Sequence, residues 1–233
     1  MRSSEEGIGG RHQATAGRLS TAAFIGIGVF VGLVVALHIL EPDFDPASRY
    51  MSEYATADTG ALMKLAFFSL AFAIGSVATA LKQLLVPAKR VKASVVCLYV
   101  TAVGIFLSGV FDSDVLVDGE VESVSVSGAL HDLSGIVAFV TLIAAAFMLR
   151  GVFSRDSLWA ARSTAQLVFA VAILVLFVVS AASPADFLGL TQRIFIPIVL
   201  VWLATLAWWI RKSSGRDHAS IDGATAQAAP ATD

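Results

Sequence analysis

The chain has 233 residues, of which 57% are hydrophobic and 15% are charged, and its mean hydropathy is +0.79. Soluble domains are about half apolar and about a quarter charged, so this composition excludes an ordinary soluble protein and predicts an integral membrane protein. The formal net charge of -2 excludes nucleic acid as a partner, and the single cysteine, Cys97, excludes an intramolecular disulfide and a cysteine-based metal site.

Six apolar runs are each close to the roughly 20 residues that a helix needs to cross a bilayer core about 30 Å thick. We expect an all-α, polytopic membrane bundle of six transmembrane helices near residues 19–40, 61–83, 91–111, 127–149, 159–181 and 191–210. The six-helix domain would span 19–212. The polar tails, 1–18 and 213–233, are expected to be disordered and cytoplasmic.

Charge predicts the orientation of these helices. Lys and Arg gather on one side, and only Arg49, Lys64 and Arg193 fall on the other. The positive-inside rule therefore places both termini in the cytoplasm of a multi-pass protein of the plasma (cytoplasmic) membrane. Three tryptophans lie beside cytoplasmic Arg or Lys and are expected to anchor at the headgroups: Trp159, Trp208 and Trp209.

The first predicted helix carries small residues at intervals of four, Gly28, Gly32 and Ala36, which predict close approach of another helix. His38 lies on a different face, one turn before Glu41, so both side chains can address the same partner. In the fifth helix, Ser163 and Gln166 are predicted to make interhelical contacts.

Carboxylates are concentrated in the loops predicted to lie outside. This excess favours a cation, a metal ion or a polar headgroup as the ligand, although solvated acidic loops would look the same. The first outer loop holds Glu41, Asp45 and Glu53, together with Ser52, for which helix capping is an alternative role. Asp112 and Asp114 follow directly after the third predicted helix.

The fourth predicted helix begins with the sharpest single signal. His131 and Asp132 are adjacent near its outer end, and small neighbours leave space around the imidazole. Ionisable residues at membrane depth usually face a bundle interior or cavity, although a structural hydrogen bond between helices is the alternative. The sixth helix places Arg193 at the same end. We expect these helix ends to converge on a ligand site formed by His38, Glu41, Asp45, Ser52, Asp112, Asp114, Asp132 and Arg193.

Two histidines and one carboxylate suit a divalent metal such as Zn or Mn and would leave one coordination position open for water. The metal ligands would be His38, Asp114 and His131, and the catalytic residues Glu53, as base, and His131. Without a metal, a histidine oriented by a carboxylate could still act as a base.

The chain resembles the membrane proteins grouped as domain-of-unknown-function family 998 over nearly its whole membrane part. The resemblance implies six spans and supports the outer cluster, and it implies no established activity. At Asp112 the family commonly has Pro, which makes Asp114 the better functional counterpart. The matching segments are Asp45-Pro, Met51-Ser-Glu-Tyr54, Gly109-Val-Phe-Asp-Ser-Asp114, Leu130-His131 and Gln192-Arg193.

Besides a purely structural role or that of a partner subunit, two kinds of function fit these features. The first is a site on the outer face that binds a cation, a lipid headgroup or a small solute. The alternative is a metal-assisted, membrane-embedded hydrolase or transferase acting on lipid headgroups. The bilayer is the expected partner in both cases, and the sequence leaves open whether the protein is an enzyme and whether it forms a homo-oligomer.

Overall fold

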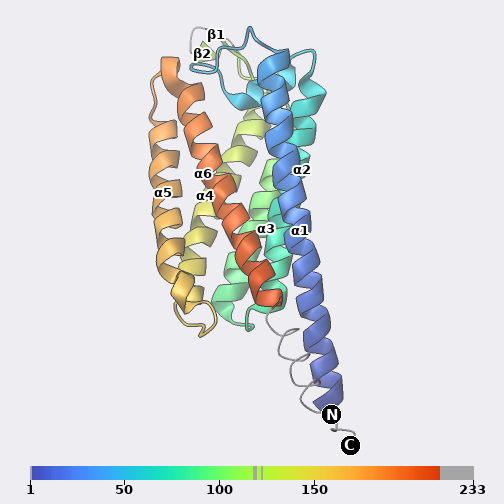
Figure 1. The fold of residues 1–233 in the computed structure, drawn as a ribbon. Coiled ribbons are helices and arrows are strands. Elements are labelled where there is room, and N and C mark those ends of the chain that lie inside the picture. The colour runs from blue at the N-terminus through green and yellow to red at the C-terminus, as the bar shows by residue number, and fades with distance from the viewer. Residues whose placement is uncertain (1, 118–119, 122, 216–233) are drawn as a thin grey trace, which may run out of the picture.

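The protein is a bundle of six long helices in the computed structural model, which describes residues 2–117, 120–121 and 123–215 (Figure 1). The long helices are α1 (Arg2–Leu40), α2 (Gly60–Leu84), α3 (Lys89–Val110), α4 (Val126–Phe153), α5 (Ser163–Ala181) and α6 (Leu188–Ser214). The shorter elements are the 3-10 helices η1 (Met51–Thr56), η2 (Ala160–Arg162) and η3 (Ala185–Phe187) and the antiparallel strands β1 (Leu116–Val117) and β2 (Glu120–Val121).

All six long helices are long and apolar enough to cross a membrane. The prediction of an all-α, six-span, multi-pass membrane protein is thereby confirmed, while the side of the membrane that each end faces stays a prediction. Helix α1 begins and α6 ends at the same end of the bundle, which we call the terminal end (Figure 1). The opposite end carries η1 and the β1–β2 hairpin, and we call it the η1 end.

Helix α1 extends through residues that we expected to form a disordered tail. It begins at Arg2, not near residue 19. Its early turns find a partner in α6: Ala16 is completely buried, and the Ser20 hydroxyl donates a 2.7 Å hydrogen bond to the carbonyl of Ala207. Most of the expected C-terminal tail, 213–233, lies outside the described residues, because the structure describes the chain only as far as residue 215.

Glycines set two close helix contacts, but not those expected in α1. A Cβ added to Gly26 would lie 2.7 Å from the Ser69 carbonyl of α2, and one added to Gly104 would lie 2.7 Å from the Ser134 carbonyl of α4. The predicted contact at Gly28 and Gly32 is wrong within this chain, because both are exposed and an added Cβ would meet nothing within 4 Å.

Gln166 joins three helices near the terminal end. Its amide nitrogen donates to the Ala146 carbonyl of α4 at 2.9 Å, and its amide oxygen accepts a 3.0 Å hydrogen bond from the Trp202 indole of α6. The predicted interhelical contact of Gln166 is therefore confirmed. The prediction was wrong for Ser163, whose hydroxyl bonds locally to the Ala160 carbonyl.

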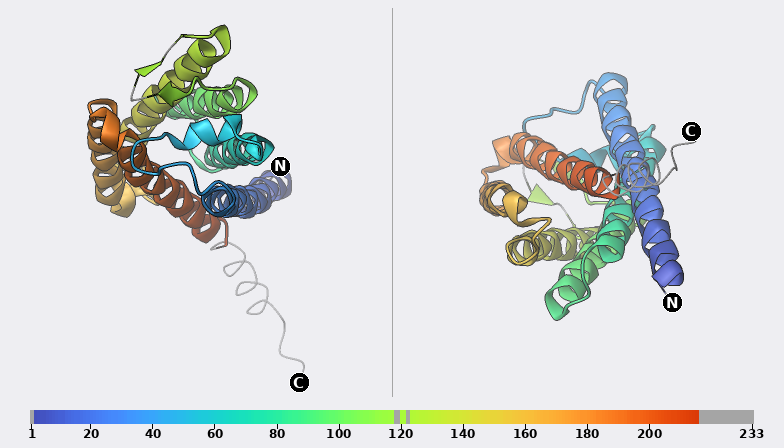
Figure 2. Two further views of the ribbon diagram at one scale, coloured as in Figure 1. Left: turned by 90° about the horizontal axis from the view of Figure 1, so that it is seen from above. Right: turned by 60° about the horizontal axis from the view of Figure 1, so that its bottom comes forward.

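Two features of the bundle position the site. Seen from above the η1 end, η1 lies across the end of the bundle (Figure 2). Helix α5 stands at the edge, packed mainly on α4 and α6, and only 17% of its apolar segment is buried, against 56% for α2. A cleft bordered by α5 therefore lies close to the outer surface of the bundle.

Candidate functional site

Arg193 fastens the loop between α1 and α2 to the first turns of α6. Its Nη1 donates to two loop carbonyls, that of Pro46 at 2.9 Å and that of Arg49 at 2.7 Å. The loop also binds α6 through its backbone, because the Leu190 amide donates to the Ala47 carbonyl at 2.8 Å. The predicted ligand residue Arg193 thus holds the loop in place.

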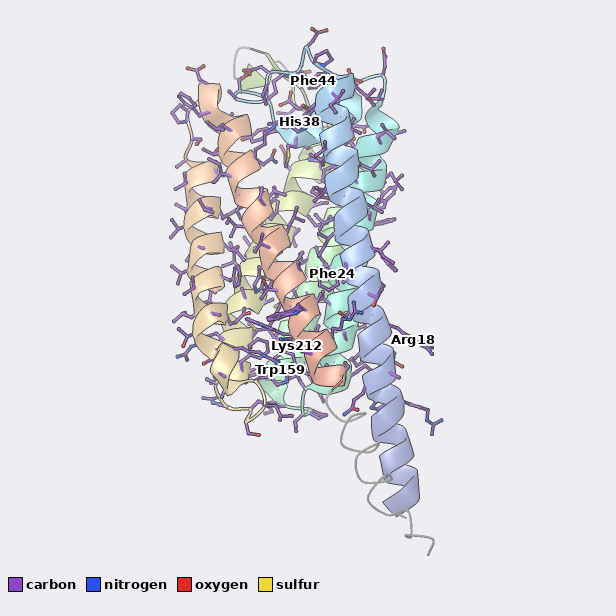
Figure 3. The ribbon with its side chains drawn as sticks, viewed as in Figure 1. Arg18, Phe24, His38, Phe44, Trp159 and Lys212 are labelled. Carbon is purple, nitrogen blue, oxygen red and sulfur yellow. The ribbon has the colours of Figure 1, made fainter. Side chains whose placement is uncertain are left out.

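His38 is the third partner of Arg193, and Figure 3 shows it near the η1 end. The Arg193 Nε donates a 2.9 Å hydrogen bond to His38 Nε2, while His38 Nδ1 lies 2.7 Å from the Val34 carbonyl. Nδ1 must carry the proton, because a carbonyl can only accept, and Nε2 then offers its lone pair to the guanidinium. Both ring nitrogens are occupied, so neither is available to a metal ion.

Glu53 and Gln192 complete the attachment of this loop. The Glu53 side chain is fully buried and accepts hydrogen bonds from Arg49 Nε and the Tyr50 amide, both at 2.9 Å. Gln192, one residue before Arg193, accepts a 2.7 Å hydrogen bond from the Met51 amide. A buried carboxylate with these partners has no access to a substrate, so Glu53 as base stays a prediction without support from its geometry. We call these residues the loop clamp: His38, Arg49, Glu53, Gln192 and Arg193.

Glu41 and Asp45 accept hydrogen bonds from other residues of the same loop. Glu41 accepts hydrogen bonds from the hydroxyl and amide of Thr59, just before α2 begins. Asp45 is exposed and accepts from the Ser48 hydroxyl and from the amides of Ala47 and Ser48. These bonds, the Ser48 hydroxyl first, hold the pKa of Asp45 below its usual value. Both carboxylates have local structural partners.

The lowered pKa of Asp45 predicts a pH dependence. A carboxyl whose pKa is depressed in the folded state stabilises the fold above its unfolded pKa of about 3.9 and loses that contribution as the pH falls through the folded value. We expect the melting temperature of the wild type in detergent to fall more between pH 6 and pH 3 than that of Asp45→Asn. Equal falls in the two proteins would show that this turn carries no such linkage.

Asp112 and Asp114 organise the corner between α3 and α4. Asp112 forms a 2.8 Å ion pair with Lys64 of α2, and its amide donates to the Ser127 hydroxyl. Asp114 accepts a 3.0 Å hydrogen bond from the amide of Ser125, the residue that caps α4. The helix dipole also favours the carboxylate of Asp114 at the N-terminus of α4. Both predicted ligand residues therefore have structural partners here.

His131 lies at the junction between α3 and α4. Its Nδ1 is 2.9 Å from the Ser108 carbonyl and 3.0 Å from the Phe111 carbonyl, two groups at the C-terminal end of α3 that lack an intrahelical partner. Nδ1 therefore carries the proton. Nε2 makes no hydrogen bond to any side chain or backbone group that the structure describes, although His131 is only 7% exposed. This ring keeps one free lone pair.

A cleft of about 300 Å³ lies beside His131, between η1 and helices α4, α5 and α6. Its apolar wall is a group of three aromatic rings from three helices, Phe139, Phe177 and Phe195, with centroids 5.0 to 5.9 Å apart. The cleft reaches the outer surface of the bundle, because Ile136, on its α4 side, is 55% exposed. Its polar lining is His131, Asp132, Tyr50, Ser52, Ser180 and Gln192.

Hydrogen-bond acceptors stand out in the polar part of this cleft. His131 contributes a free Nε2 lone pair, and Asp132 an exposed carboxylate. Burial, with the nearby carboxylates of Asp132 and Glu53, raises the pKa of the Tyr50 phenol, so Tyr50 keeps its proton at neutral pH. The lining thus combines these two acceptors with groups that can donate, namely the hydroxyls of Tyr50, Ser52 and Ser180 and the amide of Gln192.

The predicted metal ligands do not form a group. Among the residues that the structure describes, no three His, Cys, Asp or Glu side chains lie close enough together to hold a metal ion. His38 is bonded to Arg193 and Val34, and Asp114 to the start of α4, which is the physical reason that they do not join His131. A Zn or Mn centre stays a prediction that this arrangement does not support.

Comparison with known proteins assigns the chain to a family. A family model described as a protein of unknown function (DUF998) matches residues 24–209, most of the chain. The chain belongs to the DUF998 family. The resemblance noted in the sequence is confirmed, and the segments that carried it supply much of the loop clamp and the α3–α4 corner of this family member. No curated protein and no solved structure matches it.

Sequence reasoning found part of the cleft. His131, Asp132 and Ser52 were predicted site residues, and all three line it. Tyr50 and Gln192 were not selected as ligand residues, although both lie within or beside the segments shared with the family. The three phenylalanines left no signal, because each is one apolar residue within an apolar helix.

Proposed function

We propose that this DUF998 protein binds an amphiphilic molecule, a lipid or lipid-like solute, in the cleft at the η1 end. The observation that carries the proposal is the free Nε2 of a nearly buried histidine beside a wall of three phenylalanines. Because His131 lines the cleft and its Nε2 has a lone pair without a protein partner, a ligand that donates to this nitrogen would complete the site. The aromatic wall would take the adjoining hydrocarbon.

The chemistry of the lining defines the head of this ligand. His131 Nε2 and the Asp132 carboxylate both accept hydrogen bonds, so the head should carry N–H or O–H donors, as an amine or a polyol does. The negative charge of Asp132 favours an ammonium group over a neutral one. The cleft is bordered by the exposed side of α4, from which a lipid could enter without crossing the bundle.

Two parts of the proposal rest on sequence alone. The distribution of Lys and Arg favours an η1 end that faces away from the cytoplasm, across the plasma membrane. The alternative function, a metal-assisted hydrolase or transferase acting on lipid headgroups, rests on residue types alone, and no contact in the cleft favours it.

Filling the cleft tests the proposal. A Cβ added to Gly135, which lines the cleft, would meet only the Ser108 hydroxyl, at 3.8 Å, so Gly135→Leu should fold with its side chain in the ligand space. We expect this variant to bind lysophosphatidylethanolamine at least tenfold more weakly than the wild type. Native mass spectrometry of the purified protein, titrated with the lipid, measures the effect.

The matched control is Gly32→Leu, which adds the same atoms to an exposed position of α1 where a Cβ meets nothing within 4 Å. It should bind the lipid like the wild type. Dodecyl phosphate, an amphiphile whose head has no amine, should bind weakly to all three proteins. If Gly135→Leu retains full lipid binding, or if dodecyl phosphate binds as well as the amine lipid, the proposed site is wrong.

A further inference from the structure

A second cleft, of about 540 Å³, lies at the terminal end of the bundle, between the α2–α3 turn and the segment that joins α4 to η2. Three cationic side chains from these two segments line it: Lys89, Arg90 and Arg155. It shares no lining residue with the cleft at the η1 end. It therefore calls for a separate explanation.

The cations of this cleft lack acidic partners. The ion pairs among the described side chains are Arg49 with Glu53 and Lys64 with Asp112, both at the η1 end. Asp156, the carboxylate of the cleft, accepts a 2.9 Å hydrogen bond from the amide of Leu158 and so caps its own turn. Three positive charges thus face one space that holds a single carboxylate.

The guanidinium of Arg90 lies against α4. A Cβ added to Gly151 of α4 would lie 3.4 Å from Arg90 Nη1, so the side chain reaches from α3 across to α4, one turn before Arg155. The glycine leaves the room for this approach. Charges from two separate segments consequently converge, as a phosphate group with several oxygens requires.

Apolar surface continues from this cleft along α3. Leu85 and Val91 line both the 540 Å³ cleft and a neighbouring one of about 470 Å³. The rest of the lining of this neighbouring cleft is Pro87, Val95, Val96 and Tyr99, together with two lysines, Lys82 and Lys92. Tyr99 lies ten residues after the start of α3, or about 15 Å along the helix axis, so the groove runs from the basic end toward the middle of the bundle. A free phosphate would leave this apolar groove empty, whereas an acyl chain would fill it.

We infer that the terminal-end cleft binds an anionic phospholipid, with its phosphate among Lys89, Arg90 and Arg155 and an acyl chain along α3. This is a site of its own, independent of the ligand proposed for the η1 end. Basic clefts between membrane helices bind acidic headgroups in this way. The inference does not depend on which side of the membrane the terminal end faces.

Neutralising the cleft tests the inference. Each cation near an anionic lipid contributes about a fivefold factor, so Lys89→Gln, Arg90→Gln and Arg155→Gln combined should weaken phosphatidylglycerol binding on the order of a hundredfold. The measurement is native mass spectrometry of the full chain in detergent, with phosphatidylglycerol titrated against phosphatidylcholine. All three residues are exposed, so the combined variant should keep the fold, which its melting temperature checks.

The control removes three charges elsewhere at the same end: Arg18→Gln, Arg211→Gln and Lys212→Gln. It should keep binding within a few-fold of the wild type. An equal loss in both triple variants would show general surface attraction and would overturn the inference. Competition by glycerol 3-phosphate at the same concentration as the lipid would also overturn it, because the ligand would then be a soluble phosphate and not a lipid.

Discussion

Arg193→Ala should lower the free energy of unfolding more than any other single substitution in the loop clamp. The change leaves the carbonyls of Pro46 and Arg49 and the Nε2 of His38 without their donor. An unpaired, partly buried polar group costs about 1–3 kcal/mol, so we expect a loss on the order of 3–5 kcal/mol in the free energy of unfolding. Denaturation followed by circular dichroism in detergent measures it.

Arg193→Lys sharpens this prediction. An ammonium group is a point charge that cannot reproduce the fork of a guanidinium, so lysine should recover only part of the lost stability. Arg211→Ala is the matched control, because Arg211 is an exposed arginine at the opposite end of the same helix, and it should change the stability by less than about 0.5 kcal/mol. Hydrogen exchange should quicken in Arg193→Ala at the amides of Met51 and Leu190, which bind across the same junction. Wild-type stability and exchange in Arg193→Ala would rule out the clamp.

The clamp also shows why the role of acidic loop residues is hard to predict from sequence. The carboxylates of Glu41 and Asp45 were assigned to a ligand and that of Glu53 to a catalytic base, yet each accepts hydrogen bonds from nearby amides or hydroxyls. Main-chain partners leave no trace in the pattern of residue types. An acidic loop that binds a cation and an acidic loop that binds its own backbone therefore look alike in sequence.

The six spans were predictable because the length and apolarity of a span are properties of the whole segment. The packing of the helices was harder to predict, because it depends on single residues on one face. The spacing of Gly28 and Gly32 in α1 predicted a close helix contact at these residues. The face of α1 that contacts α2 holds Gly26 instead. Of the three tryptophans expected at the headgroups, Trp208 is 47% exposed, whereas Trp159 is 2% exposed and stacks on Phe153. Which face a residue occupies depends on neighbouring helices that the local sequence does not specify.

Part of the cleft lining was predicted from sequence, and the rest depends on how the helices pack. His131 stood out because an ionisable residue at membrane depth is costly and therefore unusual. Its structural hydrogen bonds, to the carbonyls of Ser108 in α3 and of Phe111 just after it, match the alternative role that the sequence left open. The ring thus has one structural nitrogen and one nitrogen free for a ligand, and only the structure separates the two.

Two substitutions of His131 should separate these roles. The amide nitrogen of an asparagine can take the place of Nδ1 and donate to the Ser108 carbonyl, but nothing replaces Nε2 in the cleft. We expect His131→Asn to lose about 1 kcal/mol of stability, for the smaller side chain, and to bind lysophosphatidylethanolamine at least tenfold more weakly. His131→Leu removes both functions and should lose about 3 kcal/mol as well as the binding, because two carbonyls at the end of α3 lose their donor. Unfolding curves and lipid titrations of the same preparations give both quantities.

The comparison of the two variants decides the role of the free nitrogen. If Nε2 binds the ligand head, His131→Asn must lose affinity while keeping most of its stability, a combination that a purely structural histidine cannot produce. A control is Phe67→Leu, which removes the edge contact of Phe67 with the imidazole, at a centroid distance of 5.8 Å, without touching either nitrogen. It should cost some stability and little affinity. Should His131→Asn bind the lipid as tightly as the wild type, His131 would be a helix-joining residue alone, and the head of the ligand would have to be sought among Tyr50, Asp132 and Gln192.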